Sequence, residues 1–268
     1  MGLDLITQRD CEVKEIVPQE ELLNQIKDRN RGFAVLNMII ESGKTREEAL
    51  ETSFTQTLVT PEGNKNVSVK VSDLIEKTNH LEQLGKKCEN CPISQNTAFG
   101  CVGYVSYPIS QKCEKWLATI AEESNKKGLP YSTTIVFIED QNVSGQRFGE
   151  MRNHGQTFFE SSKPTEIVLS KSLFKKKTID TNKLLEVTVL NGLMQTTHIN
   201  YLLMLFGGIV SDHVEPKDRY SKFNNEDKKY VYLDLNLPKD SDKSILEFYN
   251  YFQHLFIALM NGHDVFMD

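Results

Sequence analysis

The sequence lacks the motifs of the commonest nucleotide-binding and hydrolytic enzymes. Its 268 residues contain no P-loop and no Gly-x-Gly-x-x-Gly, Gly-x-Ser-x-Gly or His-Glu-x-x-His pattern. The sequence therefore gives no support to a mechanism that depends on one of these motifs. A nucleophilic Cys–His pair stays open, because such pairs assemble in space rather than along the sequence.

Long apolar runs are missing as well. The longest, from Tyr201 to Val210, is about half of the roughly 20 residues that span a bilayer. The first residues contain no apolar run of signal-peptide length, and Ile6 stands where a myristoylation signal needs Ser or Thr. We therefore expect a cytoplasmic protein that does not insert into a membrane.

Basic residues are not in excess. The chain has 31 Lys and Arg against 37 Asp and Glu, a formal net charge of −6. Sequence-independent binding to nucleic acid depends on neutralising phosphates with basic side chains, so the composition argues against it. A local lysine-rich stretch at 163–183 could contact phosphate or an acidic partner, but such a stretch is usually a solvated face. A protein partner stays open, and the sequence does not indicate the oligomeric state.

The spacing of apolar residues predicts an α+β fold. Helical spacing covers 18–42, 73–84, 110–127, 181–190, 196–206 and 241–261, and a further helix is expected to start at Thr45. Strand patterns cover 67–71, 102–107, 133–138, 166–169 and 230–235, and the polar stretch 139–157 is typical of a loop. We expect a helical part at 1–128 and an α+β part at 129–268, although a single domain remains an alternative.

Cysteine is scarce but clustered. Three of the five cysteines, Cys88, Cys91 and Cys101, lie in the stretch CENCPISQNTAFGC. The odd total does not suit a secreted disulfide framework. Thiolates at i and i+3 can bind one ion when the backbone turns tightly between them. The pattern therefore predicts a structural zinc site at these three residues.

A structural zinc ion takes four ligands, so one more is needed. His80 is the first candidate, because it precedes Cys88 by eight residues and lies off the apolar side of its helix. Cys113 is the rival, although its position on the core face of a helix suits a small hydrophobe. Cys11 is distant in sequence and is interpreted as a surface or packing residue.

Three other interpretations compete with zinc. A redox Cys-x-x-Cys pair needs a helix that opens at the motif and lowers a thiol pKa, whereas here a helix precedes the motif. An iron–sulfur cluster usually takes four cysteines at tighter spacing. Three unrelated buried thiols is the plainest alternative.

The cysteine stretch resembles a block in uncharacterised bacterial proteins that carry Cys-x-x-Cys-Pro, Phe-Gly-Cys and Tyr-Pro-Ile. The matching residues are CENCP, FGC, Gly103 and YPIS, all between Cys88 and Ser110. The resemblance implies a bacterial source and a shared local structure, and it implies no activity.

Together these patterns favour a non-enzymatic, zinc-containing protein that acts by binding a partner. The alternative is a metal-dependent enzyme in which Cys88, Cys91 and Cys101 leave an open position for water. His154, which lies near Glu150 and Arg152 in a polar stretch, could line the pocket of such an enzyme.

Overall fold

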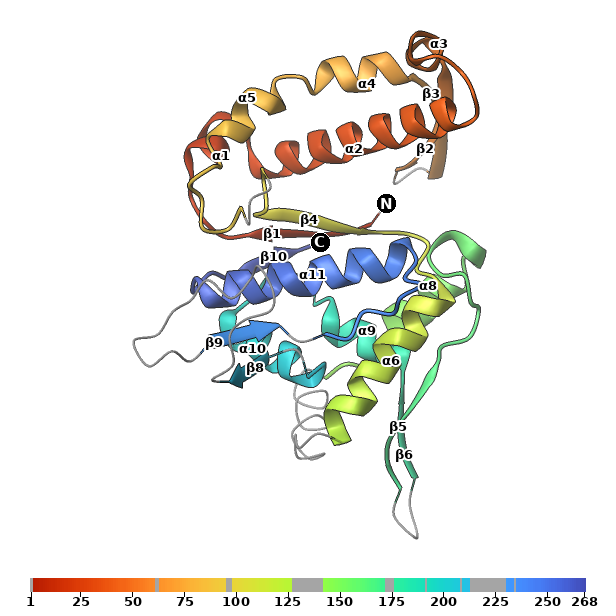
Figure 1. Ribbon diagram of the computed structural model, residues 1–268. Coiled ribbons are helices and arrows are strands. Elements are labelled where there is room, and N and C mark those ends of the chain that lie inside the picture. The colour runs from red at the N-terminus through yellow and green to blue at the C-terminus, as the bar shows by residue number, and fades with distance from the viewer. Residues whose placement is uncertain are drawn as a thin grey trace. The chain divides into compact units, whose positions relative to one another are not determined.

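The computed structural model describes residues 2–60, 63–94, 98–126, 142–171, 176–190, 192–207, 209–212, 230–233 and 235–268 (Figure 1). They form two compact units. Unit 1 is Arg9–Val102, and unit 2 combines Gly2–Gln8 with Gly103–Asp268. The fold is α+β, as the sequence predicts. The division falls between Val102 and Gly103, while the expected boundary near Gly128 lies outside the described residues.

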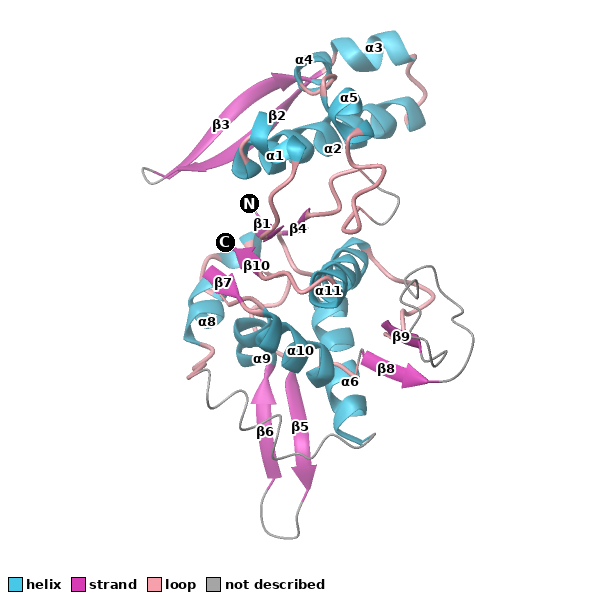
Figure 2. Cartoon of the chain, turned by 90° about the vertical axis from the view of Figure 1, so that its left-hand side faces the viewer, coloured by secondary structure: helices cyan, strands magenta, loops and turns pink. Residues whose placement is uncertain are grey.

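Unit 1 is built on one long helix, α2. Its elements in chain order are α1 (Glu12–Ile16), α2 (Gln19–Glu41), α3 (Arg46–Glu51), β2 (Ser53–Thr60), β3 (Gly63–Lys70), α4 (Val71–Lys77) and α5 (Leu81–Lys86). β2 and β3 pair as an antiparallel hairpin (Figure 2). α4 packs against α2 at Gly32, where an added Cβ would lie 3.2 Å from side-chain atoms of Leu74 and Ile75.

The predicted ends of α2 and the start of α3 are confirmed. Gly43 follows α2 with a φ of +96°, a left-handed conformation that glycine adopts without steric cost. Thr45 then caps α3 in a capping box: its hydroxyl accepts from the Glu48 amide, and the Glu48 carboxylate accepts from the Thr45 amide. Local capping chemistry therefore sets this corner of unit 1.

The single helix expected over 73–84 is wrong. α4 ends at Lys77 and α5 begins at Leu81. The Thr78 hydroxyl donates to the carbonyl oxygens of Leu74 and Ile75 at 2.9 and 3.0 Å. Such back-bonding to the preceding turn competes with regular helix geometry, so the chain bends between the two helices. The predicted strand at 67–71 is present but ends at Lys70, because Val71 begins α4.

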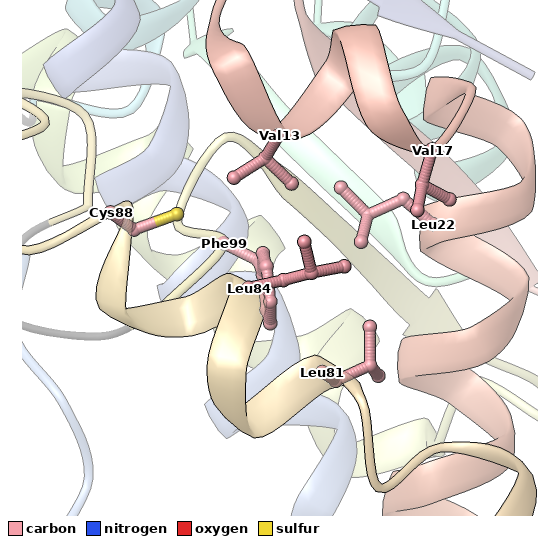
Figure 3. Close-up of a cluster of buried hydrophobic side chains, with 7 residues drawn as sticks. All are labelled: Val13, Val17, Leu22, Leu81, Leu84, Cys88 and Phe99. Carbon is pink, nitrogen blue, oxygen red and sulfur yellow. The ribbon is translucent and has the colours of Figure 1, made fainter.

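The described residues of unit 1 include two hydrophobic clusters. One lies between α2, α3 and α4 and consists of Leu36, Ile39, Ala49 and Val71. The other lies near α1 and α5 and consists of Val13, Val17, Leu22, Leu81, Leu84, Cys88 and Phe99 (Figure 3). Cys11 and Cys91 pack against the second cluster. The cysteines therefore belong to the core of unit 1 rather than to a peripheral loop.

Unit 2 contains a four-stranded sheet of order β4-β1-β10-β7. The strands are β1 (Gly2–Thr7), β4 (Val102–Ser106), β7 (Gly192–Met194) and β10 (Val265–Met267). β10 pairs antiparallel with both β1 and β7. Strand β4 confirms the expectation for 102–107. The segments 2–7 and 265–267 were not expected to be strands, because each is short and gains its partners only from distant parts of the chain.

The helix α11 (Lys243–Met260) is the centre of unit 2. The other helices among the described residues are α6 (Gln111–Lys126), α8 (Gln146–Arg152), α9 (Thr181–Thr188) and α10 (Thr196–Leu205), with a 3-10 turn at Gly155–Thr157. Phe252 of α11 contacts Trp116 and Phe206, with ring centroids 6.3 and 4.7 Å apart. The wide apolar stripe predicted for 241–261 is therefore buried as a core.

Two hairpins complete the described part of unit 2, β5 (Glu166–Lys171) with β6 (Lys176–Asp180), and β8 (Ile209–Asp212) with β9 (Tyr230–Leu233) (Figure 2). The loop expected at 139–157 is wrong over 146–152, which form α8. The strand expected at 133–138 lies outside the described residues. No helix among the described residues is long and apolar enough to cross a bilayer.

Candidate metal centre

Three segments of unit 1 bring four cysteines to one place. Cys11 immediately precedes α1, Cys88 and Cys91 follow the end of α5, and Cys101 lies just before β4. Cys88 and Cys101 are buried, with 7% and 8% of their surface exposed, while Cys11 and Cys91 are partly exposed. None forms a disulfide. The cluster therefore presents four free thiols from segments that are distant in sequence.

The four thiols line one cavity. Its volume is about 30 Å³, and its lining is Cys11, Glu12, Val13, Lys87, Cys88, Cys91, Ser94, Phe99, Gly100 and Cys101. Figure 3 shows the Cys88 sulfur pointing from the end of α5 toward the side occupied by Val13 and Phe99. A space of this size holds a water molecule or a metal ion. It does not hold a substrate molecule, since ligand pockets usually measure about 300–1,000 Å³.

Tight turns carry Cys88 and Cys91. The Cys88 amide donates to the Gly85 carbonyl at 3.0 Å, and the Cys91 amide donates to the Cys88 carbonyl at the same distance. The Ser94 hydroxyl then donates to the Cys91 carbonyl at 2.9 Å. The backbone therefore turns between the two thiols, as the i, i+3 spacing predicts for paired metal ligands.

A second turn brings Cys101 against the first. Phe99 has a φ of +63°, and its backbone amide hydrogen-bonds to the Cys88 thiol. A Cβ on Gly100 would lie 2.5 Å from the Ile93 carbonyl oxygen and 2.9 Å from that of Ser94. Only glycine lets the two turns approach this closely. The close neighbour of Gly100 is thus the backbone of residues 93–94.

Burial dominates the electrostatics of the buried thiols. It raises the pKa of Cys101 to about 11, although the nearby charge of Lys14 partly opposes the shift. Burial also raises the pKa of Cys88, and the Phe99 amide partly opposes that shift. Reactive redox cysteines need a lowered pKa. The arrangement therefore does not favour a redox pair at Cys88 and Cys91.

The four sulfurs are gathered but not yet in ligand positions. No three His, Cys, Asp or Glu side chains among the described residues stand in a metal-binding arrangement. Zinc–sulfur bonds of about 2.3 Å place tetrahedral sulfurs about 3.8 Å from one another. Binding of zinc would therefore require the thiols to move closer together than they are in this structure.

His80, the first candidate for the fourth ligand, is engaged elsewhere. It is exposed at the start of α5, and its Nε2 lies 2.9 Å from Oε1 of Gln25. Gln25 is held in turn by Glu21, at 3.0 Å. His80 does not line the cysteine cavity. Its position off the apolar side of the helix is as expected, but its neighbours are polar side chains of α2.

Cys113 belongs to unit 2, where it is fully buried on α6. Its amide donates to the Ser110 hydroxyl at 3.0 Å, which confirms Ser110 as the helix cap. Burial raises its pKa well above the ordinary value. These features suit the small-hydrophobe interpretation of Cys113.

Sequence reasoning missed Cys11 as a member of the cluster. Its distance from Cys88 hides the relation, which arises because α1 packs on α5 through Val13 and Leu84. One signal was available: Cys11 is the only cysteine outside the 88–113 region. A zinc site with three ligands in one stretch must take its fourth from elsewhere.

The polar group in unit 2 that sequence reasoning missed is a buried ion pair. Arg152 of α8 binds Glu114 of α6, and their side chains are 3% and 0% exposed. Arg152 also donates to Asn182 at 2.6 Å, and Thr181 donates to Glu114 at 3.0 Å. The available signal was the position of Glu114 on a helix face shared with Leu117 and Ala121.

The environment of His154 differs from the expectation of a catalytic loop. Arg152 is committed to the buried ion pair, and Glu150 accepts from Gln146 at 2.7 Å. His154 is exposed after α8 and contacts the Phe158 ring at 5.9 Å between centroids. A catalytic role for His154 stays a prediction without support from these contacts.

No protein-family model, no curated protein and no solved structure matches this chain. The geometry of the cysteine cluster and the surface beside it are therefore the basis for inferring a function.

Proposed function

We propose that this is a non-enzymatic cytoplasmic protein in which one structural zinc ion orders unit 1 for binding a protein partner. The observation that carries the proposal is the convergence of free thiols on one cavity of about 30 Å³. Cys88, Cys91 and Cys101 supply three ligands.

The donor set supports zinc over other ions. Thiolates select zinc, copper(I) and iron–sulfur clusters, whereas magnesium and calcium take oxygen ligands. A [2Fe–2S] cluster brings four atoms into the site, which is more than the cavity accommodates without expansion. A single zinc ion matches both the sulfur donors and the available volume.

A structural role suits the surroundings of the cavity. Phe99 and Val13 cover it, and both are at least nine-tenths buried. Several thiolates also donate charge to the metal and reduce its acidity toward a bound water. A metal-dependent enzyme with an open fourth position therefore receives no support from this geometry. Zinc would instead contribute to the folding free energy of the cysteine-rich part of unit 1.

A groove beside the cavity is the proposed partner surface. It measures about 470 Å³ and is lined by Ile26, Arg29, Asn30, Leu81, Glu82, Gly85, Lys86, Glu89, Ala98 and Phe99. Its lining combines the apolar residues Ile26, Leu81, Ala98 and Phe99 with side chains of both charges, including the Arg29–Glu82 pair at 3.0 Å. Phe99 lines both the groove and the cavity. Zinc would therefore fix one wall of the groove.

The test is the metal content of the purified, untagged full-length protein beside its Cys88→Ser variant. We expect one zinc per chain in the wild type, its loss in Cys88→Ser, and a lower unfolding temperature for the variant. Cys113→Ala is the matched control, because it also removes a buried thiol but should retain one zinc. A wild type without metal, or with iron, would contradict the proposal, as would a Cys88→Ser variant that melts like the wild type.

A further inference from the structure

The chain passes between the two units twice, and both passages adjoin the cysteine cluster. The first lies between Gln8 and Arg9, and the second between Val102 and Gly103. Cys11 follows the first passage closely, and Cys101 precedes the second. Each connecting segment therefore has a cysteine of the cluster at the end that lies in unit 1.

The two segments leave unit 2 from neighbouring strands. β4 is next to β1 in the sheet (Figure 1). A Cβ on Gly2 would meet the Val105 carbonyl at 2.5 Å, and one on Gly103 would meet the Leu5 side chain at 3.3 Å. The start of β1 thus faces the end of β4, and the end of β1 lies beside the start of β4. Unit 1 is inserted between two adjacent strands of unit 2.

We infer that Cys11 is the fourth zinc ligand, so that one ion bound by Cys11, Cys88, Cys91 and Cys101 joins both connecting segments to each other and to the end of α5. This inference rests on the proposed zinc site. It assigns a residue that the sequence pattern left out and gives the ion a second task, which is to hold the two connections together.

Three observations support Cys11 as the fourth ligand. Cys11 lines the cavity together with Cys88, Cys91 and Cys101. Its side chain makes no capping hydrogen bond to α1, so metal binding would displace no such interaction. His80, by contrast, is bonded to Gln25 and lies off the cavity.

The charge balance of the site is also suitable. Binding one Zn²⁺ forms four Zn–S bonds and releases four thiol protons to solvent, which leaves the centre with a net charge of −2. Lys14 acts electrostatically on Cys101, and Lys87 lines the cavity, where it pairs with Glu12. Lys14 provides positive charge near the place where the tetrathiolate centre would put negative charge, whereas the charge of Lys87 is offset by Glu12.

The mechanical consequence follows from the chain path. The segments 8–11 and 101–103 continue from the hydrogen-bonded strands β1 and β4 of unit 2. With the ion, their unit 1 ends share one tetrahedral centre. Opening of either segment then requires a Zn–S bond to break, so backbone amides of both segments should exchange more slowly when zinc is bound.

The experiment combines zinc affinity with amide hydrogen exchange on the full chain. The variants are Cys11→Ser, Cys11→His and His80→Ala, each measured with and without zinc. We expect Cys11→Ser to bind zinc at least about tenfold more weakly, as even lost outer-shell partners cost about 10–100-fold. Cys11→His should retain zinc, because Cys₃His sites are common. His80→Ala should match the wild type.

Exchange of amides at 8–11 and 101–103 should slow on zinc addition in the wild type and in Cys11→His, but not in Cys11→Ser. Amides in α11 report whether each variant is folded and should not respond. Unchanged zinc affinity in Cys11→Ser, or loss in His80→Ala, overturns Cys11 as the fourth ligand while the zinc proposal stands. Zinc binding without slower exchange overturns the joining of the segments. A wild type that binds no zinc overturns the proposed function itself.

Discussion

The two units obtain their order from different sources. In unit 2, the central helix α11 carries four aromatic residues that are at most 2% exposed: Phe248, Tyr251, Phe252 and Phe256. The described residues of unit 1 include two small hydrophobic clusters, and the cluster near α1 and α5 includes thiols. A small core buries too little apolar surface to be very stable alone, and metals commonly supplement such cores. Thiols therefore contribute to a core cluster of unit 1, whereas buried aromatic rings of α11 contribute to the core of unit 2.

The largest expected effect is in unit 2, at the buried ion pair. Arg152→Met leaves the fully buried Glu114 carboxyl group without its guanidinium partner. Breaking a buried pair from one side costs about 3–5 kcal/mol in free energy of unfolding. Chemical denaturation followed by the fluorescence of Trp116, which lies in unit 2, measures this loss.

The zinc content of the variant shows whether the effect of the substitution is confined to unit 2. Arg152→Met should keep one zinc per chain under native conditions, because the metal site lies in unit 1. Lys112→Ala, which removes the partly exposed partner of Asp240, is the matched control and should unfold like the wild type. An Arg152→Met protein as stable as the wild type would contradict the structural role assigned to the pair.

A smaller effect is expected from Gly100→Ala in unit 1. The new methyl group would lie 2.5 Å from the Ile93 carbonyl oxygen, so the two cysteine turns must separate. Overpacking of this kind costs about 1–3 kcal/mol, and the separation should also weaken zinc binding. Thermal unfolding and zinc competition with a chelator measure the two effects.

The control is the same substitution in unit 2, Gly149→Ala. An added Cβ there would meet only the side-chain amide nitrogen of Asn182, at an ordinary van der Waals distance of 3.6 Å. Because Gly149 lies inside α8, alanine should be neutral or stabilise by up to about 1 kcal/mol. Equal effects at Gly100 and Gly149 would mean that the close approach of the turns is unimportant.

The smallest expected effects on the free energy of unfolding come from a change of pH, and they should have opposite signs in the two units. Burial raises the pKa of Cys113 in unit 2 above its ordinary value of 9.0. The folded state then holds the thiol proton more tightly than the unfolded state, so this stability is present below about pH 9 and is lost above it. The slope for one group is at most about 1.4 kcal/mol per pH unit.

Denaturation of the full chain at pH 8 and pH 10, with reductant present, measures the slope. The loss of stability between pH 8 and pH 10 should be smaller in Cys113→Ala, because that variant has no titrating thiol at position 113. Zinc-bound thiolates in unit 1 should behave in the opposite way, because acid protonates them and releases the metal. An identical alkaline slope in Cys113→Ala would contradict the account for unit 2.

The sequence predicted the elements that carry their own local information. α11 and α2 were visible from apolar spacing, and α3 from Thr45 and its capping partners. The turn between Cys88 and Cys91 followed from their spacing. The break between α4 and α5 depends on where one Thr78 hydroxyl points, which spacing does not encode.

Relations between distant residues could not be predicted in the same way. Cys11 joins the cluster because α1 packs against α5, and Arg152 meets Glu114 because α8 packs near α6. Each contact depends on tertiary packing over tens of residues. An odd cysteine and a glutamate on an apolar helix face were the only local traces of these two sites.

X-ray absorption at the zinc edge tests the central claim most directly. For the full-length protein purified with its metal, we predict four sulfur neighbours at about 2.3 Å and no nitrogen or oxygen neighbour. Three sulfurs with one nitrogen would assign the fourth position to a histidine such as His80. Fewer sulfurs with an oxygen neighbour would indicate an open site and would contradict a closed structural centre built on Cys11, Cys88, Cys91 and Cys101.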